Sequence, residues 1–428
     1  MLDIKLIREN PKVVMDDLKK RKDPEKIKML NDLIANDKKY RELLQQVEDL
    51  KHKRNSLSKE ISKLKKEKKD ASSKMQEAKD IPDKLNISED EMEELKEKID
   101  YAMMRIPNIL HESVPVGEGE DNNVILKAWG KKPQFDFEPK NHADIVTNLG
   151  LLDEERAAKI AGSGFYYLKG SLALLDQAII RYAVESLVKK GYVFVIPPHM
   201  MRRDAYEGMV DLADFESVMY KIENDDLYMI ATAEHPVGSM FKGEVLNKDD
   251  LPLKFVGLST NFRREIGAHG KYTRGLFRVH QFNKVEQFIF CQPKNSWKYH
   301  EELQKNSEEL YQGLGLHYQV VNVCTGDIGS IAAKKYDILS WMADGVFRET
   351  GSNSNCTDYQ ARRLNIKYRE KEGQAPAGYV HTLNNTALAT SRIMVSIIEQ
   401  YQQKDGTVLI PKVLLPYMCG IKKLEKLK

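Results

Sequence analysis

The feature that most constrains the fold is a pair of apolar ladders in the first quarter of the chain. The first comprises Leu33, Tyr40, Leu43, Val47, Leu50, Leu57, Ile61 and Leu64, and the second comprises Leu85, Ser88, Met92, Leu95, Ile99, Ala102 and Ile106. Their spacing alternates between three and four residues, and in the first ladder only Asn36 and Arg54 interrupt it. A lone helix cannot bury such a seam, so each ladder needs a partner helix.

Together the ladders predict an antiparallel helical hairpin over about residues 27–105. Residues 65–73 are polar and rich in lysine, so they predict the turn between the two helices. The first ladder would extend about 45–50 Å at 1.5 Å per residue. Pro82, and the resemblance of Ser88 and Glu91 to a capping box, predict a kink or restart of the second helix near residue 88.

Charge is divided unequally between these helices. The whole chain has 67 Lys+Arg against 64 Asp+Glu, and this balance alone would argue against a polyanionic partner. Residues 51–70, however, hold nine Lys or Arg and three Asp or Glu, whereas residues 81–100 hold three Lys and eight Asp or Glu. A solvated coiled coil with paired flanks is one interpretation, and a basic arm that follows a phosphate backbone is the other. Composition leaves both open.

The remaining composition predicts a cytoplasmic protein of more than one domain. A chain of 428 residues is too long for one ordinary core, and its 41% hydrophobic content can build a core. No apolar run approaches the roughly 20 residues that span a bilayer, and the N-terminus has no apolar signal region, so we expect no membrane association. The four cysteines form no Cys-x-x-Cys pair, so we expect neither disulfides nor zinc. The predicted domains are residues 1–113 and 114–428, with a linker over about 114–148.

Residues 261–290 hold the most informative side chains. The familiar phosphate-binding loops are absent from the sequence, whereas two β-rich runs flank a loop at 266–274 that is rich in Gly, His, Lys and Arg. In the second run Arg278, Phe282 and Glu286 have the same parity, so on a strand they would share one face with neighbours about 13 Å apart. A cation, an aromatic ring and a carboxylate in a row suit a phosphate, a purine and an ammonium. The alternative, which the residues support about equally, is a half-buried sheet in which Phe282 packs into the core and the charged residues lie at the surface.

Five segments, in order, resemble the motifs of class II aminoacyl-tRNA synthetases, and their residues are closest to those of seryl-tRNA synthetases. Residues 262–265 and 278–286, on either side of the loop, resemble motif 2. The other matches are the helix and run ending at Pro198 (motif 1), the triplet 232–234 (a serine-binding Thr-Ala-Glu), residues 347–349 with 355–363 (the segment before motif 3) and residues 381–392 (motif 3). The N-terminal hairpin is also typical of that family, so the resemblance covers nearly the whole chain.

This resemblance implies an α+β fold with an antiparallel α-helical coiled-coil arm and a catalytic domain on a mainly antiparallel β-sheet flanked by helices. It implies a homodimeric serine–tRNA ligase that activates L-serine with ATP to seryl-adenylate and transfers it to the 3′ end of serine tRNA. ATP is then a substrate, and Mg²⁺ is the expected metal. The arm would contact the long variable region of the tRNA through Lys63, Lys65, Lys66 and Lys68. Use of selenocysteine tRNA as well stays open.

The resemblance also assigns residues to the site. Arg263 would hold the α-phosphate and Arg392 the γ-phosphate, and these two with Glu349 are the expected catalytic residues. The expected ATP-binding residues are Arg263, Glu265, Arg278, Val279, Phe282, Glu349, Ser352 and Arg392, with Phe282 under the adenine. The expected serine-binding residues are Thr232, Ala233, Glu234, Arg263, Glu286 and Thr386, with Glu286 receiving the ammonium. Glu349 and Ser352 would hold the magnesium ion.

Two departures from the family pattern are visible. Motif 3 normally has several glycines before its arginine, whereas residues 386–391 here hold Thr, Ala, Leu and Ser, which resembles the archaeal and eukaryotic cytosolic branch. Residues 350–354 carry Gly351 where an apolar residue and a Ser-Ser-Cys run are expected. A non-catalytic relative and a class II enzyme for another small amino acid remain alternatives. The presence of Arg263 and Arg392 disfavours the first, and Glu234 with Glu286 disfavours the second.

Overall fold

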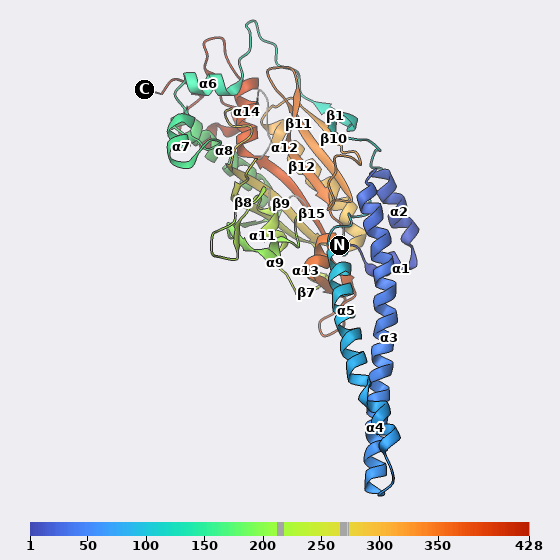
Figure 1. Cartoon of the computed structure of the whole chain (residues 1–428). Coiled ribbons are helices and arrows are strands. Elements are labelled where there is room, and N and C mark those ends of the chain that lie inside the picture. Colours follow the sequence, from blue (N-terminus) through green and yellow to red (C-terminus); the bar gives the residue numbers. More distant parts are fainter. Residues whose placement is uncertain (212–217, 266–271, 273, 428) are drawn as a thin grey trace. The chain divides into compact units, whose positions relative to one another are not determined.

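A computed structural model describes residues 1–211, 218–265, 272 and 274–427, which form two compact units (Figure 1). One unit comprises Leu2–Ile106, and the other comprises Pro107–Lys428 with Met1. The division lies before the predicted boundary at residue 113 because Asn108 already belongs to the second unit. Its side-chain amide donates to the carbonyl oxygens of Ile331 and Cys356, each at 2.9 Å.

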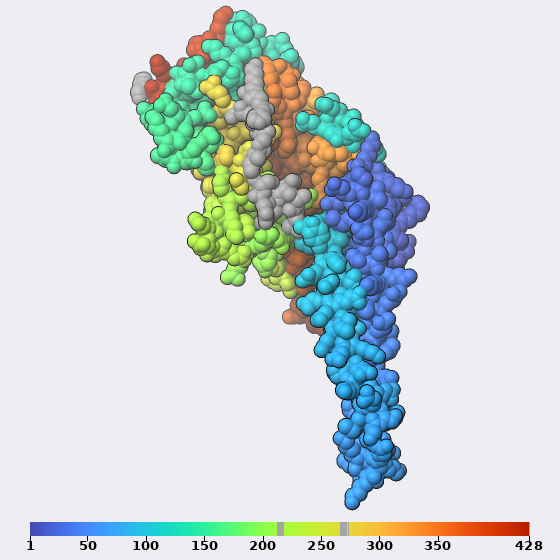
Figure 2. All heavy atoms as spheres, viewed as in Figure 1, coloured from blue at the N-terminus to red at the C-terminus, as the bar shows by residue number. Residues whose placement is uncertain are grey.

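The first unit is a helical hairpin preceded by two short helices. Its helices are α1 (Ile4–Glu9), α2 (Pro11–Lys20), α3 (Pro24–Lys66), α4 (Ser72–Lys79) and α5 (Ile81–Met103). The 43 residues of α3 extend about 65 Å at 1.5 Å per residue. Asp23 caps α3 by accepting a hydrogen bond from the N–H of Lys26 at 3.0 Å. The predicted hairpin is confirmed, and α3 and α5 lie side by side (Figures 1 and 2).

The interruption in the returning limb lies at Asp80, between α4 and α5. The restart predicted near Ser88 is wrong, because α5 runs through that residue without a break. Pro82 lies in the first turn of α5, where its missing N–H removes no helical hydrogen bond. Proline therefore marks the start of the helix and does not kink it.

The seam of the hairpin is apolar and its flanks are charged. Val47, Leu57, Ile81 and Leu85 form a buried cluster between the helices. Interhelical ion pairs flank the seam: Lys51–Glu89 at 2.6 Å, Lys53–Glu77 at 2.7 Å, Lys74–Glu60 at 3.1 Å, and Lys39–Glu91. Part of the charge asymmetry therefore serves to join the two helices.

The second unit is built on an eight-stranded sheet in the order β1-β10-β11-β12-β15-β9-β8-β4. Its strands are β1 (Val124–Trp129), β4 (Val193–Val195), β8 (Leu253–Phe262), β9 (Gln281–Cys291), β10 (Tyr318–Asn322), β11 (Lys334–Trp341), β12 (Phe347–Asn355) and β15 (His381–Ala389). Neighbouring strands are antiparallel except for β4, which runs parallel to β8. The mainly antiparallel sheet is confirmed. β1 lies within the stretch expected to be a linker and pairs with β10 instead.

Helices and short strands complete this unit. The helices include α6 (His142–Asn148), α7 (Glu154–Ala161), α8 (Gly170–Val188), α9 (Arg203–Tyr206), α11 (Glu234–Gly238), α12 (Ser296–Gly313), α13 (Tyr359–Leu364) and α14 (Thr390–Gln400). The short strands are β2 (Leu152–Asp153), β3 (Tyr167–Leu168), β5 (Met200–Arg202), β6 (Leu227–Met229), β7 (Val245–Asn247), β13 (Lys367–Arg369), β14 (Gly378–Tyr379), β16 (Val408–Leu409) and β17 (Lys423–Leu424). In the described part of the chain, no helix combines the length and apolar character needed to cross a bilayer.

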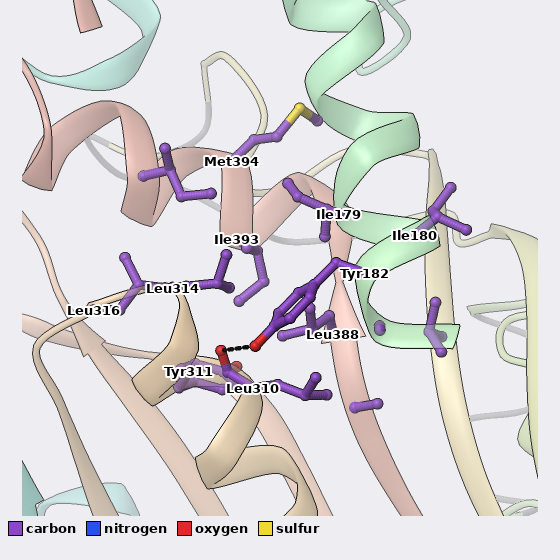
Figure 3. Close-up of a cluster of buried hydrophobic side chains, with 14 of the residues drawn as sticks. Ile179, Ile180, Tyr182, Leu310, Tyr311, Leu314, Leu316, Leu388, Ile393 and Met394 are labelled. Carbon is purple, nitrogen blue, oxygen red and sulfur yellow. Dashed lines mark hydrogen bonds between the residues drawn. The ribbon is translucent and has the colours of Figure 1, made fainter. Parts of the chain in front are cut away.

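The main core joins α8, α12 and α14 to the central strands. Ile179 of α8 and Ile393 of α14 are fully buried beside Leu388 of β15 (Figure 3). The hydroxyl of Tyr182 donates to the carbonyl oxygen of Leu310 at 3.2 Å, which ties α8 to α12 (Figure 3). This packing fixes the strands that carry the candidate site.

Candidate active site

A pocket lies among the ends of β8, β9, β12 and β15 and the start of α14. It is lined by Arg263, Glu265, Phe277, Val279, Phe282, Lys284, Glu349, Thr350, Gly351, Thr386, Ala389, Ser391 and Arg392. Seven of these residues were predicted from three separate segments of the sequence. The fold therefore brings residues from all three into one pocket.

Two arginines provide the positive charge of this pocket. Arg263 follows β8, and its guanidinium carbon lies 5.2 Å from the ring centroid of Phe282. Arg392 lies in the first turn of α14 and donates from Nη1 to the carbonyl oxygen of Glu349 at 3.1 Å. Burial lowers the pKa of Arg263, and repulsion from Arg392 lowers it further. Two such cations form a site that favours a polyanion such as a triphosphate.

Three alternate side chains of β9 share one face, namely Phe282, Lys284 and Glu286, and the first two of them line the pocket. The Nζ of Lys284 lies 2.7 Å from Oε2 of Glu286, and both side chains are buried. Thr386 stands opposite Glu286 in the β15–β9 ladder and donates its hydroxyl to the same oxygen at 3.2 Å. The carboxylate predicted to receive the substrate ammonium is thus held by a cation of the chain. Lys284 was not predicted, although its parity with Phe282 and Glu286 could have revealed it.

Arg278 lies outside this row. β9 begins at Gln281, so the prediction that Arg278 lies on the same strand as Phe282 and Glu286 is wrong. The N–H of His280 donates instead to the carbonyl oxygen of Gly164 at 2.9 Å, which takes this stretch off the sheet. Arg278 is 49% exposed and lies 3.5 Å from Glu265. The alternation rule therefore holds for Phe282 and Glu286 but fails for Arg278.

A second carboxylate, Glu234, lies at the start of α11. Its Oε1 accepts hydrogen bonds from Gln360 at 3.1 Å and Asn384 at 3.0 Å, and its N–H donates to the Thr232 hydroxyl at 3.1 Å. Burial raises the pKa of Glu234 to about 7, and the negative charge of Glu286 contributes to this rise. Gln360 and Asn384 were not predicted, because an isolated amide carries no pattern. Ala233 is buried, and none of Thr232, Ala233 and Glu234 lines the pocket.

A β-bulge in β12 places Glu349 and Ser352 on the same face of the sheet. In the ladder Glu349 pairs with Leu339 and Ser352 pairs with Asp337, which leaves Thr350 as the extra residue. Directly opposed residues share a face, and so do Leu339 and Asp337, which are two apart on β11. Glu349 and Ser352 therefore share a face although they are three residues apart. Ser352 itself is not among the residues that line the pocket.

The electrostatic surroundings of Glu349 favour its ionised form. Desolvation raises its pKa, but Arg392, Lys335 and Arg263 outweigh that effect and lower the pKa of Glu349. A carboxylate and a hydroxyl are oxygen ligands of the kind that Mg²⁺ prefers, so this pair fits the expected metal. Across the described ranges, no group of three or more His, Cys, Asp or Glu side chains could hold a metal ion.

The four lysines predicted to contact tRNA lie near the turn of the arm. Lys63, Lys65 and Lys66 belong to the last turn of α3, and Lys68 follows with a positive φ of 56°. All four are exposed, and among the residues described here none has a carboxylate within 4.0 Å. They differ in this respect from Lys51 and the other lysines that pair across the hairpin.

Comparison with known proteins agrees with this arrangement. The model of the seryl-tRNA synthetase N-terminal domain matches residues 1–110, and that of the tRNA synthetase class II core domain (G, H, P, S and T) matches residues 217–401. A serine–tRNA ligase of Methanocella arvoryzae is 55% identical over 425 residues, which cover 99% of this chain and 100% of that protein. This chain belongs to the seryl-tRNA synthetase family. The resemblance seen in the motifs is confirmed.

Solved structures of the family extend the agreement to the fold. The crystal structure of seryl-tRNA synthetase from Pyrococcus horikoshii complexed with ATP is 47% identical, with a TM-score of 0.95 over 100% of both chains. The cytoplasmic serine–tRNA ligase of Naegleria fowleri in complex with AMP is 33% identical, with a TM-score of 0.89 over 100% of this chain and 99% of that one. The α+β class II architecture with an N-terminal helical arm is therefore confirmed.

Proposed function

We propose that this chain activates L-serine with ATP to seryl-adenylate and transfers the seryl group to the 3′ end of serine tRNA. The observation that carries the proposal is that a site suited to phosphates lies next to a site suited to an amino acid. A pair of arginines suited to a triphosphate adjoins, along β9, the buried Lys284–Glu286 pair beside Glu234. A pocket of this kind can hold a nucleotide and a small amino acid with their reacting groups together.

The activation step needs alignment and charge compensation more than a protein nucleophile. An oxygen of the serine carboxylate bonds to the α-phosphorus of ATP while the bond from that phosphorus to pyrophosphate breaks. Arg263 would hold the α-phosphate, Arg392 the γ-phosphate, and the ring of Phe282 would stack on adenine. Glu349 and Ser352 would hold Mg²⁺, which when bound offsets phosphate charge.

The serine pocket would select its substrate by buried polar groups. The ammonium of serine would bind Glu286 and take the place of its contact with Lys284, while Thr386 stays as the neighbouring hydroxyl. Glu234 would accept a hydrogen bond from the hydroxyl of the substrate serine. Alanine would leave that carboxyl without its partner, and such sites discriminate strongly against the analogue that lacks the group. Threonine would be excluded by its additional methyl group.

Two macromolecular contacts complete the proposal. The unpaired lysines of the arm, Lys63, Lys65, Lys66 and Lys68, would contact the phosphate backbone of the long variable region. A second copy of the chain would cover the edge strand β4 and the residues after it, because Ile196, Met200 and Met240 expose apolar surface there. The four cysteines of the chain are free thiols, which supports a site of action in the cytoplasm.

Serine-dependent ATP–pyrophosphate exchange tests the activation step directly. We expect exchange with serine, and much less with alanine, threonine or glycine. Arg263→Ala should abolish the signal while leaving the protein folded. Exchange with alanine or threonine in place of serine would support an enzyme for another small amino acid. The absence of exchange with every amino acid would support a non-catalytic relative, and both results would reject the proposal.

A further inference from the structure

A buried carboxylate behind the pocket joins three separate segments. Glu399 of α14 is fully buried, and its Oε1 accepts hydrogen bonds from the backbone N–H and from Nδ1 of His142, each at 2.9 Å. Its Oε2 accepts from the hydroxyl of Tyr272 at 2.9 Å and from the N–H of Ala343 at 2.7 Å. A buried carboxylate is costly unless its oxygens are satisfied, and these four donors satisfy both of them.

His142 links Glu399 to residues 275–276, which precede β9 in the chain. Its Nε2 accepts a hydrogen bond from the N–H of Leu276 at 3.1 Å, so the ring hydrogen lies on Nδ1 and is donated to Glu399. Gly275 has a φ of +83°, and a Cβ at this position would lie 2.4 Å from Nε2. The backbone of residues 275–276 therefore packs directly against the imidazole.

Two of the anchored aromatic residues contact arginines, namely Arg392 of the ATP site and Arg348 beside it in β12. The ring centroid of Phe277 lies 5.2 Å from the guanidinium carbon of Arg392. The ring of Tyr272 lies 3.8 Å from the guanidinium carbon of Arg348, which directly precedes Glu349. Aromatic faces attract and orient guanidinium groups. The contacts therefore run from Glu399 to Arg392 on one route and to the residue before Glu349 on the other.

We infer that Glu399, His142 and Tyr272 are positioning residues that set Arg392 for ATP through the backbone of residues 275–277. The inference rests on the proposed function, in which Arg392 holds the γ-phosphate. None of the three residues lines the pocket. Their effect on ATP is therefore indirect, through Phe277 and Arg392, and leaves the serine pocket unchanged.

Two substitutions at His142 separate its two ring contacts. His142→Gln can still accept from Leu276 through its side-chain oxygen but loses the donor to Glu399, whereas His142→Asn keeps a donor near Nδ1 and loses the acceptor for Leu276. We expect His142→Asn to raise KM for ATP in the exchange reaction on the order of tenfold, because a small misplacement of a phosphate-binding group is costly. His142→Gln should raise it much less, and KM for serine should stay constant in both.

Tyr272→Phe and Tyr182→Phe are matched variants, and comparing them shows whether a change in KM for ATP comes from a general loss of packing. Each removes one hydroxyl hydrogen bond from a buried tyrosine, but Tyr182 donates to Leu310 (Figure 3), and neither of these residues lines the pocket. We expect Tyr272→Phe to raise KM for ATP and Tyr182→Phe to leave it unchanged at a similar loss of thermal stability. Equal effects of the two variants, or of His142→Asn and His142→Gln, would overturn the inference.

Calorimetric titration of each variant with ATP keeps this test separate from the proposed function. If the unaltered chain binds ATP but performs no serine-dependent exchange, the proposed function fails and the dissociation constants still decide the inference. A dissociation constant for ATP that rises in His142→Asn and Tyr272→Phe alone supports it. Constants that stay equal in all four variants contradict it, whatever the exchange assay shows.

Discussion

Lys284 and Glu286 are the residues of the site whose charges are most deeply buried, with side chains 7% and 2% exposed. Breaking a buried pair by removing one partner leaves the other charge without compensation, and here Glu286 would also face Glu234. We predict that Lys284→Met lowers the free energy of unfolding by about 3–5 kcal/mol at neutral pH. Urea denaturation of the two proteins measures this difference.

The exposed pair Lys51–Glu89 provides the control for that prediction. Its side chains are 46% and 45% exposed, so Lys51→Met should cost less than about 1 kcal/mol. The double substitution Lys284→Met with Glu286→Gln should recover part of the loss, because it leaves no unpaired charge. A loss at Lys284 no greater than that at Lys51 would refute the argument from burial.

The raised pKa of Glu234 predicts a specific dependence of stability on pH. In the folded chain the pKa of Glu234 is about 7, against an ordinary value of 4.5. Between these values the folded state holds a proton that the unfolded state has released, so stability falls as the pH rises from 4.5 to 7. The variant Glu234→Gln has no titratable group at this position. We expect the stability of the unaltered chain relative to Glu234→Gln to fall by at most about 3 kcal/mol across that range.

Urea denaturation of both proteins at pH 5, 6, 7 and 8 measures that difference. Other groups titrate in the same range, but they are common to the two proteins and cancel. Above pH 7 the difference should stay constant. Parallel stability curves from pH 5 to pH 8 would show that Glu234 is ionised in the folded chain throughout.

Residues of the site were predictable from sequence where a local rule applied. Strand alternation predicted that Phe282 and Glu286 share a face, and resemblance to the motifs selected Arg263 and Arg392, which the fold brings into one pocket. Gln360 and Asn384 were not predictable, because their contacts with Glu234 join segments more than 120 residues away. The prediction for Arg278 failed because residues of equal parity share a face only within one strand, and the sequence does not mark where β9 begins.

At the level of elements, the arm combines lysines of two kinds. Lys51 and Lys53 are joined to carboxylates of the returning limb, whereas Lys63, Lys65, Lys66 and Lys68 are exposed and have no such partner in the described arm. We predict that alanine at these last four positions weakens tRNA binding. It should also lower the slope of log K against log salt by about 0.7–0.9 for each phosphate that is no longer neutralised. Filter binding between 50 and 200 mM salt measures both effects.

The paired lysines supply the matched control for the arm. Lys51→Ala with Lys53→Ala removes the same kind of charge, but from ion pairs, so it should change the salt dependence much less. Serine-dependent pyrophosphate exchange should be unaffected in both variants, because the arm takes no part in activation. Equal loss of exchange and of tRNA charging in the quadruple variant would contradict the role of the arm.

Element boundaries show why part of the fold was not predictable. The hairpin followed from the two ladders, since the need to bury both seams leaves few alternatives. The break at Asp80 was misplaced, because Pro82 and Ser88 each offer a plausible helix start and only packing decides between them. The bulge at Thr350 has no sequence signature, yet it is what sets Glu349 and Ser352 on one face.

At the scale of the whole molecule, one edge of the main sheet ends in exposed apolar surface. β4 ends the sheet next to β8, and the chain beyond it exposes Ile196 to 66%. An edge strand with apolar surface invites pairing with another chain. In a two-fold dimer each such residue occurs twice in the same interface, so one substitution acts on both copies.

Ile196→Asp should therefore separate the proposed dimer. It places two carboxylates in a surface that must lose its water on association. Ile160→Asp, at a 75% exposed isoleucine of α7, adds the same charge on a helix outside the sheet that β4 ends. Light scattering should give twice the chain mass of 49.2 kDa for the unaltered protein and for Ile160→Asp, and the single mass for Ile196→Asp. Thermal unfolding of the monomeric variant should occur at a lower temperature that no longer depends on protein concentration, because association stabilises only the folded chain. If Ile196→Asp kept the doubled mass, β4 would not be the dimer contact, and another surface would have to join the two copies.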